Sequence, residues 1–257
     1  MMNSRELGIR EAEHKASALI NRFGIYQPEH IRLEDIAYTL GVQIREGVLR
    51  GASARLVRFG SHAIIRIPDT ETSIPRKRFS IAHELGHFVL NHEGMSLEIV
   101  CSDKDMMNWY SVDKETEANF FASELLMPEM LVKQRCDVRE VSLEPAKSIA
   151  SDFQTSLTAA AIRFVRFCPE PCALICSENS KIKWAVKSSE WWPFIRIGQK
   201  LDNRSLAIEH FLGHEIPEEG EELDPDVWLA DSRIQAVFEH SVALKQYGLV
   251  LSILWLM

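Results

Sequence analysis

The stretch Arg78-Phe79-Ser80-Ile81-Ala82-His83-Glu84-Leu85-Gly86-His87 decides how the rest of this sequence is interpreted. Apolar residues recur at helical spacing from Arg76 to about Asn91, which predicts an amphipathic helix. In it His83 and His87 lie four residues apart, so both imidazoles project from one face and can reach one tetrahedral metal ion. Glu84 is rotated by ~100° around the helix from His83. We expect it to lie beside the metal and to take a proton from a water molecule there.

Two histidines leave a catalytic zinc site one protein ligand short. A further helix is predicted from about Asp113 to Met127, and within it Glu115 and Asn119 are again four residues apart. We expect Glu115 to bind the metal and Asn119 to accept the outer N–H of a ligating histidine, which fixes that histidine's tautomer. Glu117 faces away from Glu115 by ~200°. It is the weaker candidate and is interpreted as a surface carboxylate.

A metal site of three histidines in one metzincin motif is excluded. That motif needs Gly at position 90 and His at position 93, where Leu90 and Glu93 stand. His92 lies outside the ligand spacing and is interpreted as a surface histidine at the end of the helix. The predicted cofactor is therefore Zn²⁺ held by two histidines and one glutamate.

These residues also carry a resemblance to a known family. The stretch Arg78 to His87, followed by Glu115-x-x-Ala118-Asn119-x-Phe121-Ala122-x-x-Leu125-Leu126-Met127-Pro128, resembles the ImmA/IrrE metallopeptidases over about residues 10 to 165. The resemblance implies a zincin-like fold, with His83, His87 and Glu115 as metal ligands and Glu84 as general base. It also implies a substrate class, namely helix-turn-helix transcriptional repressors that are cleaved to derepress stress-response or mobile-element genes.

The pattern along the chain predicts an α+β protein with three parts. These are a zincin-like peptidase domain with the active-site helix (1–143), a helical segment (144–167) and a smaller α/β C-terminal domain (168–257), expected to be regulatory or sensory. Outside the two site helices, further helices are expected at Arg5–Phe23, Leu33–Leu40, Glu144–Phe153 and Leu157–Phe167. Strands are expected at Val42–Ile44, Ala54–Val57, Ala63–Ile67, Ala173–Ile175, Lys183–Val186, Phe194–Ile197 and Leu249–Leu256.

Charge and composition limit the partners. The chain has 29 basic and 37 acidic residues, a formal net charge of −8, which argues against nucleic acid as the main partner. The acidic run Glu215 to Asp226 is interpreted as a solvated loop. No secretory signal is visible at the N-terminus. The apolar run Tyr247 to Met257 is too short to span ~30 Å of hydrocarbon and predicts a buried strand.

The five cysteines have irregular spacing, which favours reduced thiols and a cytoplasmic location. Cys168, Cys172 and Cys176 have the wrong spacing for a zinc knuckle and are interpreted as buried thiols. His210 and His214 are four residues apart, but Gly213 weakens any helix there, so a structural role is favoured. The basic run Arg76-Lys77-Arg78 is interpreted as a solvated helix start rather than an anion site.

The spacing thus predicts a cytoplasmic zinc-binding protein with no membrane partner. The resemblance implies that it is a metallopeptidase that cleaves a helix-turn-helix repressor. Two alternatives stay open. The first is a non-catalytic anti-repressor module that sequesters the repressor without cutting it, although such a module has no need of Glu84. The second is a DNA-binding regulator that uses residues 149–164, which resemble a helix-turn-helix with Ser156 as N-cap.

Overall fold

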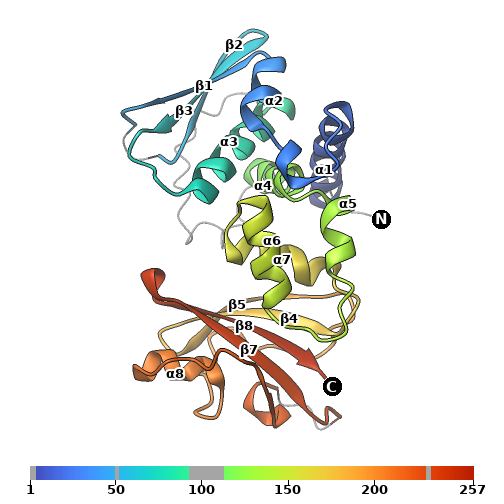
Figure 1. Cartoon of the computed structure of the whole chain (residues 1–257), viewed down its shortest axis with the longest axis vertical. Coiled ribbons are helices and arrows are strands. Elements are labelled where there is room, and N and C mark those ends of the chain that lie inside the picture. The colour runs from blue at the N-terminus through green and yellow to red at the C-terminus, as the bar shows by residue number, and fades with distance from the viewer. Residues whose placement is uncertain (1–3, 50–51, 93–112, 230–232) are drawn as a thin grey trace. The chain divides into compact units, whose positions relative to one another are not determined.

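The computed structural model describes residues 4–49, 52–92, 113–229 and 233–257. In these ranges the chain combines helices with two sheets, which confirms the expected α+β class. It divides into two compact units (Figure 1). Unit 1 comprises Met1–Leu131 with Ser151–Ser156, and unit 2 comprises Val132–Ala150 with Leu157–Met257. The three-part division expected from the sequence, with limits at 143 and 167, stays a prediction.

The apolar spacing predicts the positions of α1 Ser4–Arg22, α2 Leu33–Thr39, α3 Ile74–Val89 and α4 Asp113–Leu126. The short helix α5 Glu129–Val132 and the 3-10 turn at Pro28–His30 are not among the predicted elements. α1 buries one stripe, formed by Ala12, Ala16, Leu19 and Ile20. This stripe contributes to the core because α1 and α3 both pack against α4. α4 therefore lies between two helices, and its side chains can reach residues of α3.

A three-stranded sheet completes unit 1. Its strands are β1 Val42–Gly47, β2 Arg55–Phe59 and β3 His62–Pro68, in the order β1-β3-β2. β2 and β3 form the expected antiparallel hairpin, with Gly60 at φ 60° in the turn, while β1 pairs with β3 in parallel. β2 is thus an edge strand, and both β2 and β3 contact α3. This contact places the edge strand beside the predicted active-site helix.

Unit 2 is built on a five-stranded antiparallel sheet in the order β5-β4-β8-β7-β6. Its strands are β4 Cys172–Glu178, β5 Lys181–Lys187, β6 Glu221–Leu223, β7 Val237–Leu244 and β8 Leu249–Leu256. Its helices are α6 Glu144–Phe153, α7 Leu157–Phe167 and α8 Leu206–Leu212, with 3-10 turns at Lys133–Arg135, Pro225–Val227 and Lys245–Tyr247. α7 packs against β4 and β5, and α8 packs against β7 and β8. In Figure 1 the sheet lies between α7 and α8, and both faces of β8 are buried from Leu249 to Ile253.

Two expectations for this region are wrong in part. The run Phe194–Ile197 is not a strand: Ile195 is buried, but Phe194 and Ile197 are 79% and 55% exposed. The chain instead pairs just beyond this run, where Gly198 and Gln199 bond to Ile182. The acidic run 215–226 has mostly exposed side chains as expected, yet it also contains β6, which pairs with β7 at the sheet edge.

Two expectations about burial are confirmed. β8 is the buried strand predicted from the C-terminal apolar run. Cys136, Cys168, Cys172 and Cys176 are buried and free, while Cys101 lies outside the described residues. Among the described helices, none has the length and apolar character needed to cross a bilayer.

Candidate metal centre

α3 brings the two histidines of the motif together. Every residue from Ser80 to His87 is buried, which fixes this part of the helix against its neighbours. The rings of His83 and His87 are 4.7 Å apart between centroids, and their Nε2 atoms lie 2.9 Å from each other. The predicted shared face is therefore present, and both Nε2 atoms point to the same place.

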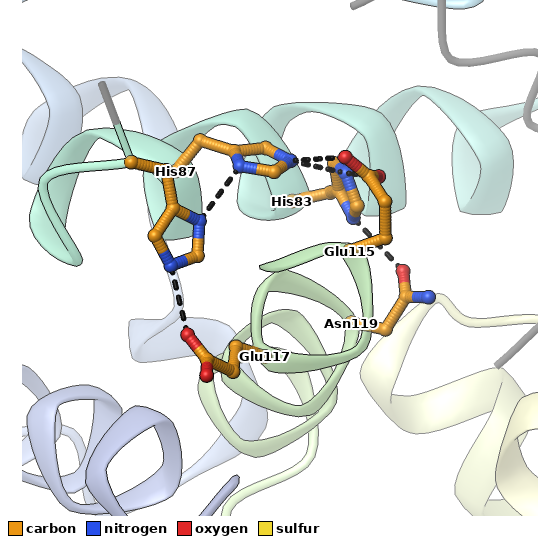
Figure 2. A network of polar contacts seen from close by, with 6 residues as sticks. His83, His87, Glu115, Glu117 and Asn119 are labelled. Atoms are coloured by element: carbon orange, nitrogen blue, oxygen red, sulfur yellow. Dashed lines mark hydrogen bonds and ion pairs between the residues drawn. The ribbon is translucent and has the colours of Figure 1, made fainter. Parts of the chain in front are cut away.

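α4 supplies the carboxylate that the sequence predicts. Glu115 Oε2 lies 3.2 Å from Nε2 of His83, and Oε1 lies 3.4 Å from Nε2 of His87 (Figure 2). The ligand atoms of these three residues all lie within 4.8 Å of one another, and within the described ranges no other group of three or more His, Cys, Asp or Glu is arranged in this way. Burial alone would raise the pKa of Glu115, but hydrogen bonds and charge from His83 and His87 in their protonated, metal-free form hold this pKa at about 2. Glu115 is thus an anionic carboxylate at neutral pH, the form that ligates metals.

The close approach of α3 and α4 depends on Gly86. A Cβ atom at this position would lie 3.0 Å from Cδ1 of Phe121 and 3.2 Å from Cα of Ala118, both on α4. A side chain at position 86 would therefore hold the two helices apart. Glu115 reaches the histidines because glycine is present at this crossing.

Asn119 lies where the sequence places it. Its Oδ1 is 2.9 Å from Nδ1 of His83. An amide oxygen can only accept, so Nδ1 of His83 carries the proton and donates it. The electron pair on Nε2 is then available to a ligand on the opposite side of the ring.

The donor set fits a divalent transition metal. Without a proton between them, the Nε2 electron pairs and the Glu115 carboxylate would repel one another, and a cation among them removes this repulsion. Two imidazoles and one carboxylate are the protein ligands of a common class of catalytic zinc site. A position for water or substrate stays open in such a site.

His92 and Glu117 are the residues that sequence reasoning missed. His92 is not a surface histidine: its side chain is only 6% exposed, and its Nδ1 lies 2.9 Å from Nδ1 of His87. Its Nε2 lies 2.9 Å from Oε2 of Glu117, whose side chain is 22% exposed. Burial lowers the pKa of His92, and its hydrogen bond with Glu117 opposes this shift. The two residues extend the polar network behind His87, and Figure 2 labels Glu117 at its end.

A helix C-cap explains why His92 returns to His87. Asn91 adopts the left-handed conformation at φ 54°, the N–H of His92 bonds to the carbonyl of His87, and the N–H of Asn91 bonds to that of Phe88. This pair of bonds is the Schellman motif, in which asparagine is a frequent residue in the left-handed position. An asparagine directly after the last apolar residue of the helix is the sequence signal from which this turn could have been predicted.

Glu84 lies on the same helix in a different environment. Its side chain is 3% exposed, and the backbone N–H of Leu56 on β2 donates a hydrogen bond to its carboxylate. Burial raises the pKa of Glu84 to about 7, and the neighbouring Glu115 adds to this rise, while His87 and the bond from Leu56 oppose it. A carboxyl group with a pKa near neutrality can both accept and release a proton at neutral pH.

The remaining candidates from the sequence take no part in a metal cluster. His214 pairs with Glu209 at 2.7 Å, and Gly213 ends α8 in the left-handed conformation. The basic run at the start of α3 has local partners: Arg76 and Lys77 pair with Glu71 and Glu46. Arg78 donates to the backbone carbonyl of Ile31. The run therefore lies at the start of α3, half-buried and with partners from the protein itself.

Comparisons with known proteins identify a matching family and a similar fold. A family model described as Peptidase_M78, IrrE N-terminal-like domain, matches residues 37–165. Among curated proteins no match was found. A solved structure described as a Mycobacterium tuberculosis transcriptional regulator resembles the fold with a TM-score of 0.57 at 14% sequence identity, covering 96% of this chain and 76% of that one.

Proposed function

Because the chain belongs to the Peptidase_M78 family of IrrE N-terminal-like domains, we propose that it is a zinc-dependent endopeptidase of zincin-like fold. The observation that carries this proposal is the convergence of His83, His87 and Glu115 beside the buried carboxyl group of Glu84. Ligands and general base come from two adjacent helices of unit 1, which is the arrangement a metal-assisted hydrolase needs.

In this proposal Nε2 of His83, Nε2 of His87 and the carboxylate of Glu115 hold the metal. Bound Zn²⁺ supplies Lewis acidity, which polarises a scissile carbonyl and makes a nearby water molecule more acidic. Asn119 holds His83 in the tautomer that presents Nε2 to the site. The three ligands are assigned from the atoms that face the site. Asn119 is assigned from its contact with the outer nitrogen of His83.

Glu84 is the proposed general base. Its burial keeps bulk water away and raises its pKa to about 7, so that it can accept a proton from water and pass it to the leaving amine. The hydrogen bond from the backbone of Leu56 orients the carboxyl group on the side of β2. Glu84 therefore acts on the proton without being a ligand.

The proposed substrate is a helix-turn-helix transcriptional repressor. Two observations support it: the resemblance to the ImmA/IrrE metallopeptidases, and a solved fold neighbour that is itself described as a transcriptional regulator. Cleavage of the repressor in the cytoplasm would derepress the genes under its control. In the same proposal residues 168–257, which lie in unit 2 apart from the proposed ligands of unit 1, regulate the peptidase.

The decisive experiment compares the wild-type chain with Glu84→Gln. The repressor encoded by an adjacent gene, or a panel of helix-turn-helix repressors, is incubated with each Zn²⁺-loaded protein, and the products are identified by mass spectrometry. General-base catalysis contributes ~10²–10⁴-fold, so cleavage should fall by that factor while metal content and repressor binding stay unchanged. Glu29→Gln, a change of an exposed carboxylate in the same unit, is the matched control.

Two further measurements separate the alternatives. If cells that carry Glu84→Gln still derepress the target genes with the repressor uncut, the protein is a sequestering anti-repressor and the peptidase proposal fails. If the chain instead binds operator DNA with an affinity that falls steeply with salt and cleaves no repressor, residues 149–164 carry the function.

A further inference from the structure

His83 and His87 differ in what supports them from behind. The outer nitrogen of His83 meets an amide oxygen, that of Asn119, at 2.9 Å. The outer nitrogen of His87 meets Nδ1 of a second histidine, His92, also at 2.9 Å, and that histidine in turn meets the carboxylate of Glu117 (Figure 2). His83 thus has a single hydrogen-bonding partner behind it, whereas His87 has two residues in series, first His92 and then Glu117.

The carboxylate of Glu117, at the end of this series of hydrogen bonds, determines which nitrogen of each histidine carries the proton. A carboxylate can only accept, so Nε2 of His92 donates to Glu117. In the neutral ring Nδ1 of His92 is then an acceptor, and the hydrogen bond at 2.9 Å requires Nδ1 of His87 to be the donor. His87 is left with its electron pair on Nε2, the atom that faces Glu115 and His83.

Three local features hold this series of hydrogen bonds in place. The Schellman turn at Asn91 folds His92 back onto His87. The position of Glu117 on α4 places its carboxylate beside His92, two residues from the ligand Glu115. Gly8 on α1 leaves room for that carboxylate, because a Cβ atom there would overlap Oε1 of Glu117 and would lie 2.8 Å from its Cδ.

We propose that His92 and Glu117 are positioning residues that fix the tautomer and ring orientation of His87 for metal binding. The proposal rests on the proposed metal site and adds two residues to it. Glu117 selects the tautomer of His92, and His92 selects that of His87. Neither residue touches the metal, and both act through the ligand.

An exposed pair in unit 2 shows why burial matters here. His214 and Glu209 form a histidine–carboxylate contact of 2.7 Å, but the His214 side chain is 65% exposed. Water competes for both partners of that exposed pair, so the contact does little to fix the orientation of either side chain. His92, at 6% exposed, has Glu117 and His87 as its partners and is enclosed between them.

The first test measures Zn²⁺ affinity by competition with a chromophoric chelator, using the full chain. His92→Leu removes the acceptor behind His87, and affinity should fall by ~10–100-fold, the usual effect of losing an outer partner of a ligating histidine. His92→Asn restores an acceptor oxygen near the position of Nδ1, the same group that supports His83. It should recover part of the lost affinity.

A second readout separates positioning from general stability. Co²⁺ in place of Zn²⁺ gives visible absorption bands that depend on the geometry of its ligands. His92→Leu should shift these bands, and His92→Asn should bring them back toward those of the wild type. If both variants bind Zn²⁺ with wild-type affinity and leave the Co²⁺ bands unchanged, the positioning role is wrong.

A third variant, at Gly8 on α1, acts on the hydrogen bonds between His87, His92 and Glu117. Gly8→Ala on α1 displaces the Glu117 carboxylate without changing any residue of the network, so Zn²⁺ affinity should fall although alanine favours the helix. Gly47→Ala is the matched control, since a Cβ atom there meets nothing within 4 Å. Equal affinities for these two variants would contradict the part assigned to Glu117.

The failure of this inference can be distinguished from the failure of the proposed function. If wild-type protein binds no Zn²⁺, or if Glu115→Ala binds it as well as wild type does, the metal site itself is wrong. If wild type binds Zn²⁺ tightly, Glu115→Ala does not, and the His92 variants match wild type, only the positioning chain is wrong.

Discussion

At the scale of single residues, the histidines of this protein differ in which nitrogen is committed to a hydrogen bond. His83 and His87 use Nδ1 toward a partner behind them and keep Nε2 for the site. His240 on β7 is committed in another way, because its Nδ1 accepts the backbone N–H of Leu143 at 3.2 Å. Its role is structural, and its titration therefore reports on folding rather than on catalysis.

His240 predicts how the stability of unit 2 depends on pH. Burial lowers its pKa below 6.5, Lys147 adds to this effect and Glu144 opposes it. Below pH 6.5 the unfolded chain takes up a proton on this histidine that the folded chain refuses, so the free energy of unfolding should decrease as the pH falls from about 6.5 through the lowered pKa. Denaturant titrations between pH 7.5 and 5 measure this decrease.

His240→Asn keeps an acceptor near the position of Nδ1 but cannot be protonated. We expect the variant to lose less stability than the wild type over the same pH range. His210→Asn on α8 is the control. If His240→Asn shows the same pH dependence as the wild type, groups other than His240 cause the decrease in the free energy of unfolding.

At the scale of secondary-structure elements, the site depends on the distance between α3 and α4. Glu115 and its two histidines belong to different helices, and Gly86 allows these helices to approach. The local sequence of α3 fixes where the imidazoles point, while the crossing with α4 fixes whether a carboxylate meets them. The metal site is therefore sensitive to Gly86, a residue that has no side chain.

Gly86→Ala tests this dependence. Overpacking costs ~1–3 kcal/mol, and the better helix propensity of alanine returns ~1 kcal/mol, so the free energy of unfolding of unit 1 should fall by up to ~2 kcal/mol. Zn²⁺ affinity should fall as well, because Glu115 is moved away from Nε2 of His83 and His87. Gly47→Ala should change neither quantity; wild-type Zn²⁺ affinity in Gly86→Ala would show that α4 adjusts without moving its ligand.

At the scale of the whole molecule, the two units hold different chemical groups. All proposed metal ligands lie in unit 1, while Cys136, Cys168, Cys172 and Cys176 lie in unit 2. Burial raises the pKa of both Cys136 and Cys176 to about 12. Cys136 and Cys176 should thus react only when unit 2 opens, which makes these two thiols reporters of that unit.

We expect Zn²⁺ to stabilise unit 1 selectively. A ligand at 100 times its Kd stabilises the state that binds it by ~2.7 kcal/mol. Hydrogen exchange of peptides from α3 and α4 should slow accordingly, while alkylation of Cys136 and Cys176 in denaturant should keep its midpoint. An equal shift of both signals with Zn²⁺ would show that the two units unfold together.

The sequence alone determines those features that depend on local spacing. His83, Glu84 and His87 can be assigned from one turn of helix, because residues four apart share a face whatever surrounds them. Helices α1 to α4, the β2–β3 hairpin and the buried strand β8 follow from apolar periodicity and turn residues for the same reason. Glu115 and Asn119 are also four residues apart, which makes them candidates whatever α3 contacts.

Only the tertiary structure decides which residues meet across elements. Glu117 is interpreted as a surface carboxylate from its angle on α4, yet α3 and its C-cap place His92 against it. The run Phe194–Ile197 has the composition of a strand, but the hydrogen bonds that would pair it are made by Gly198 and Gln199 instead. Periodicity describes one element at a time, whereas hydrogen-bond partners and burial come from segments that are distant in the sequence.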